Sequence, residues 1–204
     1  MFEVSQIKTQ GSPPPAMKDH SAIICDGAMW VFGGVDAKEK SLDSTFKLDL
    51  ATRTWTRLKT RGTAPKPRSG HVAVAFNGQM FVHGGVVDGA RRDGAVYSLD
   101  LARLEWTCMK TSMPGPKAAF HASALFAPLW LLYGGIQDDS TLSNGFKALN
   151  LETGKWLSIE VRSAKDLEAL SRGTLVVVGQ TLYRLFGQDA GGRVSASVNQ
   201  FDLS

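Results

Sequence analysis

Cysteine is scarce in this chain of 204 residues, where Cys25 and Cys108 are the two present. They lie in different parts of the sequence and give no disulfide framework, so we expect a reducing, cytoplasmic compartment. Long apolar runs are missing too, since no segment approaches the roughly 18 consecutive apolar residues of a transmembrane helix. The N-terminus also lacks the basic start and apolar run of a secretory signal. We therefore expect no membrane partner.

Clustered positive charge is equally absent. Lys and Arg number 23 against 19 Asp and Glu, for a net charge of +4. A balance this mild biases encounters towards acidic partners, but it lacks the basic footprint of a nucleic-acid binder, so no nucleic-acid partner is expected. With 43% hydrophobic and 21% charged residues, the chain has the composition of a folded protein with a core.

The sequence does contain an internal repeat, marked by three features that keep the same phase. A tryptophan recurs at intervals of 51 and 50 residues, and it follows the second residue of a glycine pair by 21 residues each time. A histidine lies 14 residues before that second glycine. The marks are Trp55, Trp106 and Trp156, then Gly34, Gly85 and Gly135, then His20, His71 and His121. One supersecondary unit is therefore copied about every 50 residues.

Within each copy, the two-residue hydrophobic period and the β-branched and aromatic content indicate strands. In the second copy they are predicted at residues 71–75, 80–83, 96–101 and 105–109. Asn77-Gly78 suits the tight hairpin between the first two. Four antiparallel strands per repeat form the unit of a β-propeller blade, so we predict an all-β propeller or partial propeller.

The chain resembles the kelch-repeat family on these marks. The glycine pair ends a hydrophobic strand in Trp30-Val31-Phe32-Gly33-Gly34, and an aromatic residue and the tryptophan follow it. The resemblance covers residues 1–204 and implies a single domain with repeats at about 20–70, 71–120, 121–171 and 172–204. The last repeat is degenerate, because Phe186-Gly187 replaces the glycine pair and the chain stops before a tryptophan strand.

Residues 4–11 align without a gap on residues 55–62. The chain thus begins with a fourth strand and ends with a third, so an N-terminal strand at residues 2–9 is predicted to complete the last blade. Two arrangements follow: a ring closed within one chain, or an open arc that self-associates or belongs to a longer protein. Residues 163–170 have a helix-like composition and are interpreted as a structural insert between blades.

Each repeated residue has a structural role that needs no ligand. The three tryptophans are expected to be equivalent core residues. The phased histidines are expected to be hydrogen-bonded structural residues, because a zinc site needs three or four ligands at one point. His83 lies outside the phase and is expected in the core. We predict no catalytic residue, no metal and no cofactor.

Alternating strand direction gathers the longer loops at one end of the blades, where binding residues usually lie. The segments between blades are basic, and the loops after the glycines are richer in acids. The candidate partner-binding residues are Arg68, Ser69, Lys117, Lys18, Asp36, Asp88, Arg91, Arg92 and Asp138. Arg68 and Ser69 come first by the resemblance, which implies that these two side chains point into the central mouth.

The sequence thus predicts a non-enzymatic scaffold or adaptor that binds a protein or peptide, preferably one with an acidic motif. The alternative is a kelch-type enzyme, such as a metal-dependent specifier protein or a sugar epimerase, because fold does not determine function.

Overall fold

Short hairpins build the first three blades of the computed structural model, which describes residues 5–161 and 167–203. Blade 1 contains β3 (Ser21–Cys25), β4 (Ala28–Phe32), β6 (Thr45–Asp49) and β7 (Thr54–Leu58). Blade 2 contains β10 (Val72–Phe76), β11 (Gln79–His83), β14 (Val96–Asp100) and β15 (Glu105–Cys108). Blade 3 contains β17 (Ala122–Phe126), β18 (Leu129–Tyr133), β20 (Phe146–Asn150) and β21 (Trp156–Ile159). The predicted four-stranded antiparallel blades are confirmed.

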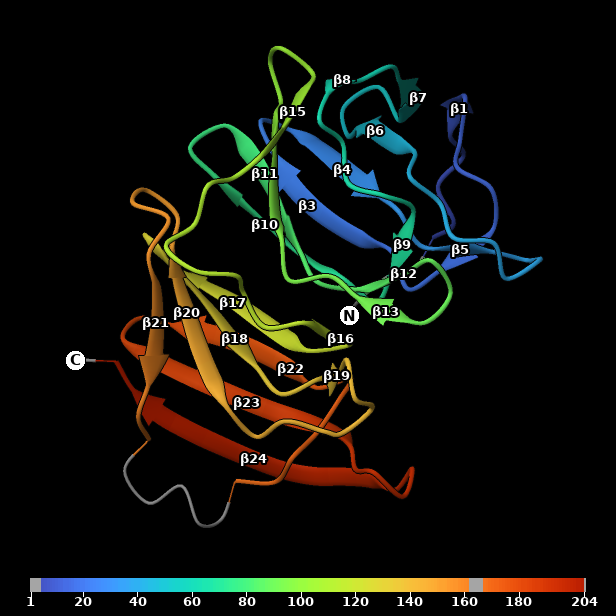
Figure 1. Ribbon diagram of the computed structural model, residues 1–204. Coiled ribbons are helices and arrows are strands. Elements are labelled where there is room, and N and C mark those ends of the chain that lie inside the picture. Colours follow the sequence, from blue (N-terminus) through green and yellow to red (C-terminus); the bar gives the residue numbers. More distant parts are fainter. Residues whose placement is uncertain (1–4, 162–166, 204) are drawn as a thin grey trace.

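Blade 4 has three strands within the described ranges: β22 (Thr174–Val178), β23 (Thr181–Gln188) and β24 (Val194–Asp202). The blades follow one another along an open arc, with blades 1 and 4 at its two ends (Figure 1). The described residues include no helix long and apolar enough to cross a membrane. Of the predicted insert, residues 163–166 lie outside the described residues, and residues 167–170 form no helix.

The two-residue turns that the sequence predicted fix the pairing of the first two strands. Asn77 and Gly78 have φ angles of 46° and 70°, and Asp26 and Gly27 have 48° and 71°. Positive φ at both central residues matches the right-handed twist of the flanking strands. Val72 consequently lies opposite His83 in an uninterrupted antiparallel register.

Nine two-residue strands complete the sheets within the described residues. Six pair next to the glycine motifs: β2 (Met17–Lys18) with β5 (Val35–Asp36), β9 (Arg68–Ser69) with β12 (Val86–Val87), and β16 (Ala118–Ala119) with β19 (Ile136–Gln137). A seventh, β13 (Arg91–Arg92), pairs with β12. The last two pair in parallel with the outermost strand of a blade: β1 (Gln10–Gly11) with β7, and β8 (Arg61–Gly62) with β15.

The core lies between blades. Trp106 of blade 2 packs on Phe32 of blade 1, with ring centroids 5.0 Å apart, and is 1% exposed. Trp156 of blade 3 packs in the same way on His83 of blade 2 and is 6% exposed. Trp55 belongs to the first blade and remains partly exposed. The expected equivalence of the three tryptophans is therefore wrong for Trp55, because its ring has no preceding blade to cover.

Backbone hydrogen bonds also join the blades around the central mouth. Gly70 N donates to Asp19 O (2.9 Å), Phe120 N to Gly70 O (2.7 Å) and Arg172 N to Phe120 O (2.7 Å). These four residues occupy equivalent places in the four repeats, and all have φ between 56° and 64°. We call this series the mouth ladder. Through it, the residues just before the first strands of blades 2, 3 and 4 are hydrogen-bonded to the preceding blade.

Candidate functional site

The basic segments between blades and the acidic loops after the glycines lie side by side, as predicted. Each interblade segment ends in a short strand that pairs antiparallel with the residues after the glycine pair. Arg68 lies opposite Val87 in blade 2, and Lys18 lies opposite Val35 in blade 1. Ala118 likewise lies opposite Gln137 in blade 3. Charges of both signs are therefore brought to the same end of the blades.

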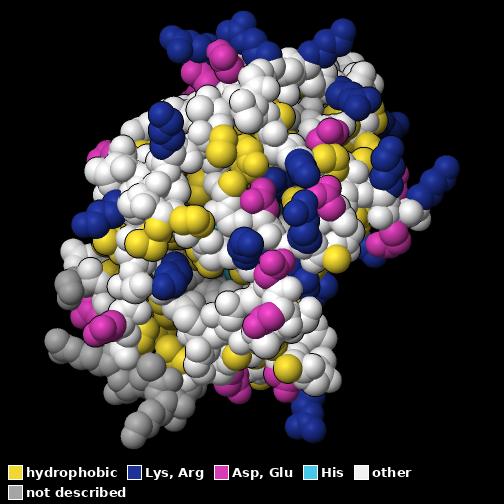
Figure 2. Space-filling view, in the orientation of Figure 1, with side chains coloured by type: hydrophobic (Ala, Val, Ile, Leu, Met, Phe, Trp, Pro, Cys, Tyr) yellow, Lys and Arg dark blue, Asp and Glu magenta, His cyan; other side chains and the backbone are white. Residues whose placement is uncertain are grey.

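The predicted residues come together most closely where blades 2 and 3 meet. A hollow of about 270 Å³ is lined by Lys66, Val87, Arg91, Arg92, Asp93, Tyr97, Lys117 and Asp138. Of the predicted residues, Arg91, Arg92, Lys117 and Asp138 line it directly, and Asp88 contacts its rim. Lys and Arg side chains alternate with Asp and Glu side chains over this part of the surface (Figure 2). We call it the interblade hollow.

Exposed ion pairs surround the interblade hollow. Lys66 Nζ lies 3.0 Å from Asp88 Oδ2, which Arg91 Nη2 also contacts. These hydrogen bonds, from Arg91 first and Lys66 second, lower the pKa of Asp88. Lys117 Nζ lies 3.9 Å from Asp138 Oδ2, with side chains 62% and 43% exposed. Pairs this exposed contribute little to stability.

Arg92 has a different environment from its exposed neighbours. Its Nη1 donates to the Ala90 carbonyl at 2.8 Å, and its backbone N–H donates to Asp138 Oδ1 at 2.9 Å. Its Nε is buried and has no partner among the described residues. A buried donor without an acceptor is costly. The Arg92 guanidinium is therefore held through Nη1, while its buried Nε–H has no acceptor among the described residues.

Arg68 does not point into the mouth as an exposed donor, which corrects the expectation that put it first. Its side chain is 0% exposed, and Nη2 lies 2.8 Å from Asp93 Oδ2. Nη1 donates to the Gly84 carbonyl at 2.8 Å, and the guanidinium lies over the Tyr97 ring. A fully paired, buried arginine supports the floor of the hollow and does not reach a partner. Ser69 beside it is also buried, at 7% exposure.

Lys18 and Asp36 lie apart from the interblade hollow, in blade 1. Lys18 Nζ pairs with Glu39 Oε1 at 2.8 Å. Asp36 Oδ1 accepts hydrogen bonds from the backbone N–H groups of Lys40 (3.0 Å) and Lys38 (2.9 Å), and these lower the pKa of Asp36. The Asp36 carboxylate is thus engaged in shaping its own loop.

The histidines fall into two groups. His71 and His121 are buried and hydrogen-bonded, His71 Nε2 to Ser21 Oγ at 2.8 Å and His121 Nε2 to His83 Nδ1 at 3.2 Å. His83 is in the core, as predicted. His20 differs from its equivalents because it is exposed at the mouth. The described residues contain no group of three or more His, Cys, Asp or Glu that could hold a metal ion.

Burial lowers the pKa of His71 to about 3 and that of His121 to about 4. The pKa of His83 is also well below its ordinary value, because of burial and then His121 and Arg68. In the His83–His121 contact one neutral imidazole donates its N–H, and the other accepts through its unprotonated nitrogen. These residues are therefore uncharged parts of the core at neutral pH.

Sequence reasoning missed several residues at this end of the molecule. Lys66, Asp93 and Tyr97 line the interblade hollow but were not candidates. Arg172 was not a candidate either. It lies over the Phe120 ring at 4.0 Å, and its Nη1 is 3.7 Å from Asp19 Oδ1 across the mouth. Lys66, Asp93 and Arg172 were visible as charges in loop segments, whereas Tyr97 lies in a strand, and residue spacing did not show which loops would meet.

Antiparallel blades joined through tryptophans and glycine pairs define a β-propeller of the kelch class, here with its sheets in an open arc. The chain belongs to the kelch-repeat family: residues 1–203 match the family model described as the KLHDC2/KLHL20/DRC7 Kelch-repeats domain. This agrees with the resemblance found in the sequence.

Individual relatives are similar over large parts of the chain. Acyl-CoA-binding domain-containing protein 4 of Arabidopsis thaliana is 30% identical over 96% of this chain. Host cell factor 2 of Homo sapiens and alpha-scruin of Limulus polyphemus are each 32% identical, over 62% and 64% of it. The chain spans 30%, 19% and 14% of the lengths of these three relatives.

Proposed function

We propose that the chain is a protein-interaction scaffold that binds an acidic segment of its partner at the interblade hollow. The observation that carries the proposal is the convergence of Lys66, Arg91, Arg92 and Lys117 on one hollow. Loops on a rigid propeller hold these cations in place, and charged donors form the stronger hydrogen bonds to carboxylates.

The size of the hollow suggests what enters it. A volume of about 270 Å³ suits one or two acidic side chains rather than a whole folded surface. The rest of the acidic segment would lie across the loops. There its carboxylates would replace Asp88 as the partner of Lys66 and Arg91, and Asp138 as the partner of Lys117.

Peptide binding tests this proposal. A panel of Asp- and Glu-rich peptides is labelled and titrated with the protein in fluorescence anisotropy, next to peptides with Asn and Gln in the same places. We expect the acidic peptides to bind more tightly. The double variant Arg91→Gln, Lys117→Gln should weaken this binding by about tenfold, or about 1.4 kcal/mol.

A matched control is available at the opposite end of the blades. Arg103 and Lys155 lie near the tight turns between third and fourth strands and are exposed. Arg103→Gln with Lys155→Gln removes the same charge and should leave the affinity unchanged. Equal losses in the two double variants would show a general charge effect and refute the hollow as the site.

A further inference from the structure

The charges around the interblade hollow do not balance. Its four cations and the two exposed carboxylates that pair with them are Lys66, Arg91, Arg92 and Lys117, then Asp88 and Asp138. Asp93 also lines the hollow, but the buried Arg68 engages its carboxylate at 2.8 Å. Over the lining residues and their ion-pair partners, two positive charges are therefore in excess.

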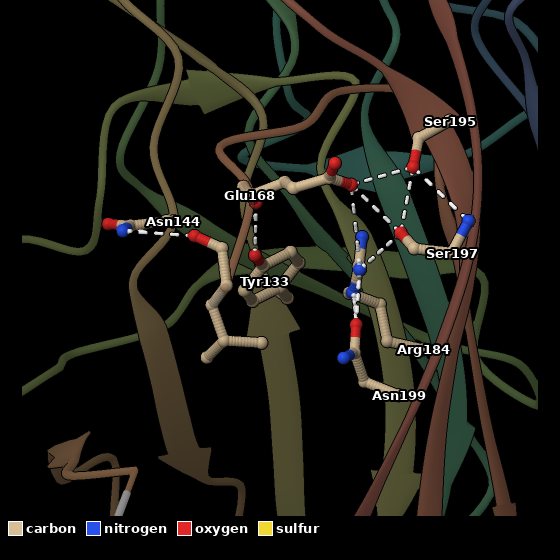
Figure 3. A network of polar contacts seen from close by, with 8 residues as sticks. Tyr133, Asn144, Glu168, Arg184, Ser195, Ser197 and Asn199 are labelled. Carbon is tan, nitrogen blue, oxygen red and sulfur yellow. Dashed lines mark hydrogen bonds and ion pairs between the residues drawn. The ribbon is translucent and has the colours of Figure 1, made fainter. Parts of the chain in front are cut away.

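A carboxylate in this protein is satisfied by less positive charge than the hollow holds. Figure 3 shows the carboxylate of Glu168, which accepts hydrogen bonds from Ser195 (2.6 Å) and Ser197 (2.8 Å). Its ion-pair partner is the single guanidinium of Arg184, with Nη2 at 4.0 Å. One arginine and two hydroxyls thus match one negative charge. A single carboxylate from a partner would leave half of the excess charge at the hollow unmatched.

The cations of the hollow also come from three separate segments. Lys66 precedes β9, Arg91 belongs to β13, and Lys117 precedes β16. One oxygen of Asp88 serves both Lys66 Nζ, at 3.0 Å, and Arg91 Nη2. Lys117 Nζ is 3.9 Å from the nearest oxygen of Asp138, which is longer than a hydrogen bond. An anion with several oxygens pointing in different directions would give each of these cations its own acceptor.

The hollow combines a rigid floor with a movable rim. Arg68 is 0% exposed, and its guanidinium lies 5.0 Å from the centre of the Tyr97 ring. The side chains of Lys66, Arg91 and Lys117 are 60%, 68% and 62% exposed. Ion pairs this exposed hold their partners weakly. These side chains can therefore turn towards a bound anion while the floor stays in place.

We propose that the segment bound at the interblade hollow carries a phosphorylated serine or threonine, and that its phosphate group enters the hollow. A phosphate monoester carries about −1.5 to −2 charges at pH 7 and three strong acceptor oxygens. It therefore matches both the excess charge and the spread of the cations, and clusters of basic side chains are a recurring means of binding phosphorylated segments. The assignment rests on the proposed function, because it names the group that the same hollow takes. Binding then depends on a kinase that acts on the partner.

Four versions of one acidic peptide test the assignment by fluorescence anisotropy. They carry serine, glutamate, phosphoserine or the monomethyl ester of phosphoserine at one central position. The monomethyl ester keeps the tetrahedral shape but has a single negative charge. We expect the phosphoserine version to bind about tenfold more tightly than the glutamate version, and the monomethyl ester to bind about as tightly as glutamate.

The outcomes separate this assignment from the proposed function. Phosphoserine that binds no more tightly than glutamate, or than its own monomethyl ester, would overturn the phosphate assignment and leave the binding of acidic segments intact. Acidic peptides that bind no better than their Asn and Gln counterparts would refute both.

The double variant Lys66→Gln, Arg91→Gln tests the position of the phosphate. It removes the two cations that share Asp88 and, with them, the excess charge. The preference for phosphoserine over glutamate should fall from about tenfold to about twofold, whereas Arg103→Gln with Lys155→Gln should retain it. Both double variants should melt close to the parent, because exposed charges contribute little to folding. A preference that persists in the folded Lys66→Gln, Arg91→Gln protein would place the phosphate elsewhere and overturn the proposal.

A lipid headgroup could present the same phosphate chemistry. The parent protein and the Lys66→Gln, Arg91→Gln variant are therefore also sedimented with vesicles that contain phosphatidylinositol phosphates. We expect no binding that depends on these two cations. Vesicle binding that the variant loses, without tighter binding of the phosphopeptide, would assign the hollow to a membrane lipid and overturn the proposal.

Discussion

The indole of Trp106 lies 5.0 Å from the ring of Phe32, and this contact joins the last strand of one blade to the second strand of the blade before it. Trp156 repeats the relationship on His83. Blades 2 and 3 therefore each supply the aromatic side chain that closes the interface with the preceding blade. Stability resides in these interfaces, as expected when a repeat contacts only its neighbours.

Trp106→Ala should therefore lower the free energy of unfolding by about 3 to 5 kcal/mol, the usual loss for a buried aromatic residue. Trp55→Ala should cost much less, because Trp55 is partly exposed and closes no interface between described blades. Urea denaturation of both variants measures the difference. Equal losses would mean that Trp55 is buried in solution by a contact with another chain or segment.

Arg68→Ala should be strongly destabilising, by about 3 kcal/mol, because it leaves Asp93 without its buried partner. Lys66→Ala removes an exposed cation nearby and should cost less than about 1 kcal/mol. Thermal unfolding of the two variants distinguishes a structural arginine from a surface contact. Similar melting temperatures would contradict the buried position of Arg68.

Stability should fall as the pH drops below about 6.5, before the carboxylates titrate. His71 and His121 have folded pKa values of about 3 and about 4, so the unfolded chain binds more protons between those values and its own pKa of about 6.5. Each histidine contributes a slope approaching about 1.4 kcal/mol per pH unit. Urea midpoints at pH 7.5, 6 and 5 measure it, and His83→Phe should remove one histidine's share. A flat profile would contradict neutral burial.

Gly84→Ala should be far more harmful than Gly78→Ala, although both residues have positive φ. A Cβ at Gly84 would lie 2.5 Å from the Ala118 carbonyl oxygen and from the His121 ring, whereas a Cβ at Gly78 would meet nothing within 4 Å. Gly78→Ala should cost about 1 kcal/mol for conformation alone. Chemical denaturation of the two variants checks the order, and comparable losses would mean that blades 2 and 3 are not in close contact at Gly84.

The blade architecture could be predicted from the sequence because the marks that define it are local. The glycine pair, the hairpin dipeptide and the tryptophan each act within one copy, and repetition multiplies a weak signal. Trp106 and Asn77-Gly78 could thus be assigned to their positions before any contact was known.

The candidate site could be predicted only in part, because it depends on contacts between copies. Charge in the loops indicated Arg91, Arg92 and Lys117. The spacing did not reveal that Arg68 would be buried and paired with Asp93. The contact between His83 and His121 is also a meeting of two copies, and the phase of the repeat predicts only the second of these residues.

The mouth ladder has a consequence for how such proteins change in size. Each step, such as Phe120 on Gly70, uses one donor and one acceptor and repeats the same backbone angles. A further copy placed after Arg172 or before Asp19 would continue the series with no new type of contact. Duplication of a segment of about 50 residues can therefore lengthen the array without a new kind of contact between blades. The number of blades can vary while the same backbone hydrogen bond joins each blade to the one before it.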